Sequence, residues 1–107
     1  MATQDTDVRV IPDVTYIVAN REDLERPYRV IIENDDVTPM DFVVMALRLF
    51  FGLSLDDALN VMLTAHNEGR ALVAIFPLEE AQERVYSAHT AAREEGYPLT
   101  FYLEPEA

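Results

Sequence analysis

The chain contains only three glycines, and each closely follows a segment with the apolar spacing of a helix. Glycine is the commonest residue in the left-handed conformation that ends helices, so Gly52, Gly69 and Gly96 are predicted helix stops. Three helices bounded in this way leave only short segments for strands. The chain is therefore predicted to fold as an α+β domain in which the helices pack on a small sheet.

Start signals precede the same three segments. Thr38 is a predicted N-cap, with Pro39 at the first helical position and Asp41 in the first turn. Ser54 is the predicted N-cap of the second helix and precedes two aspartates, which the positive end of a helix dipole favours. The third helix is expected to begin near Leu78, with two glutamates in its first turn.

Three short apolar segments with β-branched or aromatic residues flank these helices. They span residues 28–33, 71–76 and 98–103. The expected order is β-α-α-β-α-β in a single domain over residues 28–107, with a three-stranded antiparallel sheet packed against three helices.

Residues 1–27 differ from this core in pattern. Pro12 and Asp13 interrupt a β-branched run, and the charged stretch NREDLER follows before Pro27. We expect an N-terminal extension that forms a flexible or extended arm or a loose edge strand.

The composition excludes several classes of protein. The formal charge is −12, and all eight basic residues are arginine. Such a field repels phosphate backbones and anionic lipid but attracts cations, including the ammonium group of a peptide N-terminus. Without cysteine there is no disulfide, thiolate nucleophile or cysteine-bound zinc. No apolar run reaches the ~20 residues of a membrane span, and we expect a cytoplasmic protein with no nucleic acid or membrane partner.

Two polar features could carry chemistry. Asn34, Asp35 and Asp36 separate the first strand from the first helix, where acceptors can converge, although these residue types are also typical of a plain turn. His66 shares a helical face with Met62, although a lone histidine is more often a surface or core residue.

Catalytic patterns are weak. His66 and His89 fall on different predicted helices, so no metal-binding spacing is present, and no serine or threonine has a histidine in the context of a triad. We therefore expect neither a metal nor a cofactor. An enzyme that uses Asp35, Asp36 and His66 remains one alternative, and an interaction domain without a pocket remains another.

Three runs carry a family resemblance. In order along the chain they are NDDVTPMDFV, VMLTAHNEGRALVAIF and YPLTFYLE. Together they resemble the ClpS adaptor family over residues 28–104. The resemblance implies a monomeric, non-enzymatic core similar to the C-terminal domain of the ribosomal stalk protein. It also implies that the chain recognises N-degrons beginning with Leu, Phe, Tyr or Trp and delivers them to a Clp ATPase through the N-terminal domain of ClpA or ClpC.

The resemblance also assigns roles to individual residues. The amine-binding positions of the family correspond here to Asn34, Asp35, Asp36 and His66. Its hydrophobic pocket corresponds to Ile32, Thr38, Met40, Val43, Met62, Ala65 and Leu99. The positions that dock the Clp ATPase correspond to Glu79 and Arg84, and Met40 resembles the gatekeeper that excludes β-branched first residues.

The chain departs from the family pattern at three positions. Glu33 replaces a residue that is usually apolar, Ala65 stands where Val is common, and Arg84 stands where Lys is frequent. The smaller Ala65 is expected to enlarge the pocket and to favour aromatic first residues over Leu.

Overall fold

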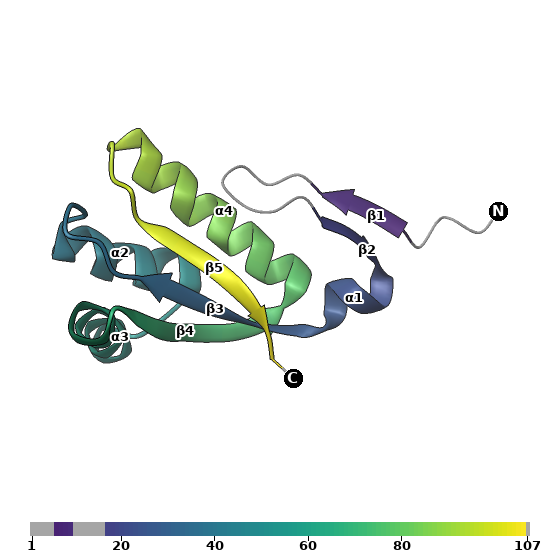
Figure 1. Cartoon of the computed structure of the whole chain (residues 1–107), viewed down its shortest axis with the longest axis horizontal. Coiled ribbons are helices and arrows are strands. Elements are labelled where there is room, and N and C mark those ends of the chain that lie inside the picture. Colours follow the sequence, from purple (N-terminus) through teal and green to yellow (C-terminus); the bar gives the residue numbers. More distant parts are fainter. Residues whose placement is uncertain (1–5, 10–16, 107) are drawn as a thin grey trace.

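The computed structural model describes residues 6–9 and 17–106, and it places three helices against one face of a three-stranded sheet (Figure 1). The elements of this core follow one another as β-α-α-β-α-β, which confirms the predicted order. They are β3 (Pro27–Glu33), α2 (Met40–Phe51), α3 (Leu55–Glu68), β4 (Arg70–Pro77), α4 (Leu78–Glu94) and β5 (Thr100–Pro105).

The sheet has the order β4-β3-β5, and both pairings are antiparallel. The middle of its central strand β3, residues 30–32, is apolar and buried on both sides of the strand. Val30 and Ile32 belong to the main core beneath the helices, whereas Ile31 lies outside that core and is still only 1% exposed. Ile31 pairs in register with Leu72 and Tyr102, so neighbouring strands shield it on the outer face.

Small residues allow α4 to approach the sheet closely. Ala81, Ala88 and Ala92 are fully buried along this helix. Larger side chains from α2 and β5 fill the remaining space, and the rings of Phe51 and Phe101 lie 4.8 Å apart. Helix α2 and strand β5, which are distant in sequence, are therefore packed together in the core.

All three predicted glycine stops have a positive φ, and Gly96, just after the end of α4, has φ of 79°. Gly52 ends α2 with φ of 73°, and Gly69 ends α3 with φ of 93°. The backbone N–H of Gly52 donates to the carbonyl of Arg48 at 3.1 Å. Each glycine thus closes its helix in a left-handed conformation that a residue with a Cβ adopts only at a cost.

Several boundaries differ from the prediction by one or two residues, and two of them bear on the site. Thr38 is not the N-cap of α2, because its hydroxyl donates to Asp35 Oδ2 at 3.0 Å and Pro39, in an extended conformation, occupies the cap position. The last strand begins at Thr100, not at Pro98, so Leu99 lies in the connection before β5.

The N-terminal part contains more regular structure than the sequence analysis assigned to it. Strands β1 (Thr6–Arg9) and β2 (Ile17–Asn20) pair in an antiparallel hairpin, and the charged stretch forms the short helix α1 (Arg21–Glu25). The Asn20 side chain caps this helix by accepting a hydrogen bond from the backbone N–H of Asp23 at 2.9 Å. The expectation for the segment around Pro12 lies outside the described residues.

Replacing Gly52 by alanine should lower the free energy of unfolding by ~1 kcal/mol, because a left-handed alanine is strained. No atom lies within 4 Å of the added Cβ, so the cost would come from the backbone alone. Gly52→Asn should cost less, since asparagine tolerates this conformation. Urea denaturation of the three proteins measures the difference, and equal stability of Gly52→Ala and wild type would contradict this account.

Candidate functional site

A cavity of about 270 Å³ opens where β3 leads into α2. Its walls come from the end of β3 and the loop after it, the start of α2, the second half of α3, and the connection before β5. The lining residues are Ile32, Glu33, Asn34, Asp35, Asp36, Val37, Thr38, Pro39, Met40, Val43, Met62, Ala65, His66 and Leu99.

Every residue that the sequence analysis assigned to the amine site or to the pocket lines this cavity. Three further residues, Glu33, Val37 and Pro39, line it without having been assigned. They lie between or next to assigned residues, so their place in the chain was the signal that could have found them.

The cavity is apolar at its base and polar at its mouth. Ile32, Ala65 and Leu99 are at most 3% exposed, and Val43 and Met62 are also buried. Met40, by contrast, is 48% exposed at the start of α2. A side chain that entered would therefore exchange water for aliphatic and thioether contacts, with Met40 at the border of the cavity.

The carboxylate of Asp35 organises the loop between β3 and α2. Its Oδ1 accepts hydrogen bonds from the backbone N–H groups of Val37 at 2.9 Å and Thr38 at 2.6 Å, and its Oδ2 accepts one from the Thr38 hydroxyl. Such a turn, in which a side chain replaces a backbone acceptor, fixes the conformation of the loop.

A backbone bond ties this loop to the end of α3. The N–H of Asn34 donates to the carbonyl of Gly69 at 2.9 Å. His66 lies in the last turn of α3, three residues before Gly69. The bond therefore brings the polar residues of the loop and the imidazole of α3 to one cavity, although more than thirty positions of sequence separate them.

The charge around the cavity is negative. Glu33, Asp35 and Asp36 all line it, and among the described lining residues no arginine opposes them. The net charge of −12 acts in the same direction. A cationic group would therefore be attracted to the mouth of this cavity, and a carboxylate or phosphate would be repelled.

The second histidine does not line the cavity. His89 is 1% exposed within α4, and its Nε2 accepts a hydrogen bond from the backbone N–H of Phe101 at 3.0 Å. Within residues 6–9 and 17–106, no three histidine, cysteine, aspartate or glutamate side chains gather in a way that could hold a metal ion. The same part of the chain contains no helix long and apolar enough to cross a membrane.

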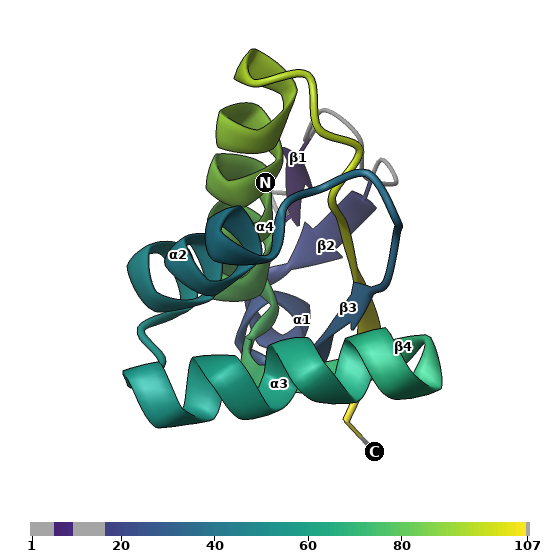
Figure 2. The same cartoon turned by 90° about the vertical axis from the view of Figure 1, so that its left-hand side faces the viewer.

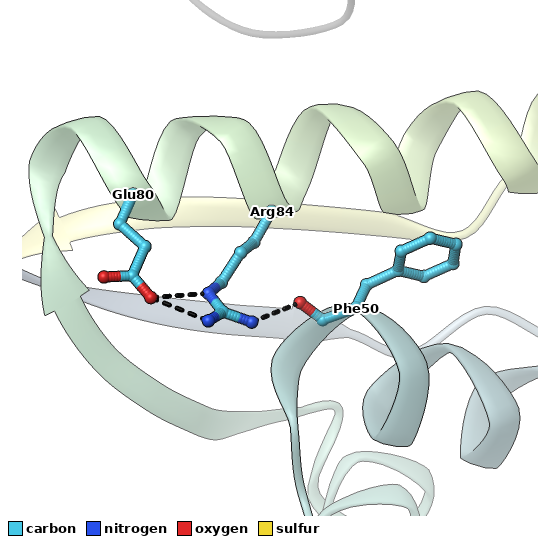
Figure 3. Close-up of polar contacts among 3 residues, drawn as sticks. All are labelled: Phe50, Glu80 and Arg84. Atoms are coloured by element: carbon cyan, nitrogen blue, oxygen red, sulfur yellow. Dashed lines mark hydrogen bonds and ion pairs between the residues drawn. The ribbon is translucent and has the colours of Figure 1, made fainter.

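The two residues assigned to docking lie elsewhere, on the first half of α4. Arg84 is fixed by its neighbours (Figure 3): its Nε and Nη2 reach Glu80 Oε2 at 2.8 and 2.7 Å, and its Nη1 donates to the carbonyl of Phe50 at 2.9 Å. The guanidinium also lies 4.5 Å from the centre of the Phe76 ring. Glu79 is half-buried in the first turn of the same helix. Neither residue lines the cavity.

Comparison with known proteins gives a consistent result. The family described as ATP-dependent Clp protease adaptor protein ClpS matches the chain over residues 23–102. ClpS 1 of Bradyrhizobium diazoefficiens is 45% identical over 85 residues, which cover 78% of this chain and 84% of the relative. ClpS of Wolinella succinogenes is 44% identical over 79 residues, which cover 74% of this chain and 78% of the relative.

Among solved structures, Agrobacterium tumefaciens ClpS2 bound to L-phenylalaninamide is similar to this chain with a TM-score of 0.73 and 38% sequence identity. The match covers 77% of this chain and 99% of the other. The similarity therefore includes nearly the whole of that protein.

Replacing Asp35 by alanine should lower the free energy of unfolding by ~1 to 3 kcal/mol, because the partly buried N–H of Thr38 would lose its acceptor. Asp36 provides a matched control, since it is the next residue and its side chain is exposed. Asp36→Ala should change stability by less than ~0.5 kcal/mol. Thermal and urea denaturation measure both variants, and an equal effect would show that the Asp35 turn does not stabilise the loop.

Proposed function

Since the chain belongs to the ClpS family of Clp protease adaptors, we propose that its cavity holds the first residue of a substrate protein and that the chain delivers this substrate to a Clp ATPase-protease. The observation that carries the proposal is the cavity itself, which has an apolar base and an acidic mouth with acceptor groups. The similarity to a structure bound to L-phenylalaninamide supports it, because this ligand has a free α-amine and a benzyl side chain.

The mouth of the cavity suits an N-terminal ammonium group, which has one positive charge and three donors. The side-chain oxygen of Asn34 and the unprotonated ring nitrogen of His66 can each accept one of these donors. Asp36 is exposed and adds negative charge. Asp35 adds charge as well, but its hydrogen bonds hold the loop, so we assign it mainly to the positioning of Asn34.

The base of the cavity suits a bulky first side chain, such as that of Leu, Phe, Tyr or Trp. Burying a Leu or Phe side chain contributes ~1.5 to 3 kcal/mol, and a charge-assisted hydrogen bond contributes about as much. One side chain and the two bonds to Asn34 and His66 reach ~4.5 to 9 kcal/mol before the costs of association, compared with ~8 kcal/mol for micromolar affinity. Met40 stands at the border of the cavity, where it can exclude β-branched first residues.

Delivery requires a second surface, and we assign it to the first half of α4. Glu79 and Arg84 lie on this helix outside the cavity, so a substrate and the N-terminal domain of ClpA or ClpC can bind at the same time. We further propose that the chain acts as a cytoplasmic monomer without catalytic turnover. The N-terminal extension, residues 1–27, would then contribute to the transfer of the substrate.

A peptide with a free N-terminal Phe should bind with micromolar affinity in a fluorescence anisotropy titration. N-acetylation of the peptide should weaken binding at least ~100-fold, because it removes the positive charge and leaves one N–H donor of the original three. Asn34→Ala should weaken binding at least ~10-fold. Asn60→Ala, an exposed asparagine of α3 outside the cavity, is the control and should bind normally. Equal binding of the acetylated and free peptides would refute the assignment of the amine site.

Reversing the charge of Glu79 should slow delivery without changing peptide affinity. In Glu79→Arg, the Clp-dependent degradation of a reporter that begins with Phe should slow at least ~10-fold. The reason is that the introduced positive charge would no longer complement the surface of the Clp ATPase that docks on Glu79. Glu83→Arg changes the same charge at an exposed position of the same helix and should have a much smaller effect. Normal degradation with Glu79→Arg would place the docking surface elsewhere.

A further inference from the structure

One wall of the cavity lies outside regular secondary structure. Leu99 lines the cavity and is 1% exposed, yet it lies in the connection between α4 and β5. This connection reaches the same end of the molecule as the loop between β3 and α2, as Figure 2 shows. The position of the wall therefore depends on the contacts that hold the connection, and not on a sheet ladder at Leu99 itself.

The side chain of Arg93, at the end of α4, holds this connection by bonding its backbone carbonyls. Its Nη1 donates to the carbonyl of Leu99 at 2.9 Å and to the carbonyl of Tyr97 at 3.0 Å. Hydrogen bonds from a charged donor are stronger than those from a neutral one. The Tyr97 ring also packs edge to face on Phe42 of α2, with the ring centres 4.9 Å apart. The connection is thus held between two helices.

His89, one turn earlier on α4, holds the other side of Leu99. Its Nε2 accepts the backbone N–H of Phe101 at 3.0 Å, so this nitrogen carries no proton. Positions four residues apart lie on the same face of a helix, so His89 and Arg93 point toward the same segment. Together they fix the carbonyl of Leu99 and the N–H group two residues later.

We propose that Arg93 and His89 are positioning residues that set the depth of the cavity through Leu99 and thereby rank the first side chains that it accepts. The inference rests on the proposed function of the cavity. Its physical basis is the short range of dispersion contacts, since a gap of ~0.5 to 1 Å forfeits a quarter to a half of the attraction. A displaced wall would leave such a gap beside a small Leu side chain, whereas a larger ring would still reach it.

The test compares Arg93→Met with wild type in anisotropy titrations with two peptides that differ only in a first residue of Leu or Phe. We expect affinity for the Leu peptide to fall ~5-fold and affinity for the Phe peptide to fall less than ~2-fold. Arg93→Lys keeps one charged donor and should give an intermediate ratio. Arg70→Met is the matched control, because Arg70 is also exposed and bonds Glu104 instead of the cavity wall.

His89 provides an independent variant. His89→Gln keeps an acceptor near Phe101 and should retain the wild-type ratio, whereas His89→Leu should shift it in the same direction as Arg93→Met. Melting temperatures are measured for all variants, since a merely structural role would lower stability and leave the ratio unchanged. That outcome in Arg93→Met would overturn the inference and leave the proposed function intact. Failure of wild type to bind either peptide would overturn both.

Discussion

The hydrogen bond between the N–H of Asn34 and the carbonyl of Gly69 is the contact on which the site depends. It joins the loop after the central strand to the end of α3, and the two parts of the cavity mouth meet there. The Asp35 turn supports this contact, because it gives the loop one conformation before any ligand arrives. A site organised in advance loses little conformational entropy when it binds.

The helices and strands form one part of the cavity, and the connections between them form another. Strand β3 and helices α2 and α3 supply the buried base of the cavity through Ile32, Val43 and Ala65. The loops supply its polar mouth and, through Leu99, one wall. Helix α4 contacts both kinds of segment: Arg84 in its first half bonds the end of α2, and its last turns hold the connection before β5. The proposed recognition of a substrate and the proposed docking of a Clp ATPase can therefore share one scaffold without sharing a surface.

Local signals predicted most of the fold, and the failures have local causes as well. The stops at Gly52 and Gly69 were predicted correctly, because a positive φ is a property of one residue and its neighbours. Thr38 was misassigned as an N-cap because its hydroxyl has a competing acceptor in Asp35, which the cap pattern does not consider. Helix α1 was missed, since its five residues are too few to show an apolar period.

The sequence by itself determined the order of the core elements, the negative charge and the residues that the family resemblance assigned to the cavity. Spacing and residue type are enough for these conclusions, because the conclusions depend on local conformation and on motifs that can be recognised in the sequence alone. Only the tertiary structure decided that Asp35 holds the loop, that Arg84 bonds the end of α2, and that Arg93 and His89 hold the segment around Leu99. Contacts between distant segments leave no periodic trace in a single sequence, since the partners are chosen by how the helices pack on the sheet.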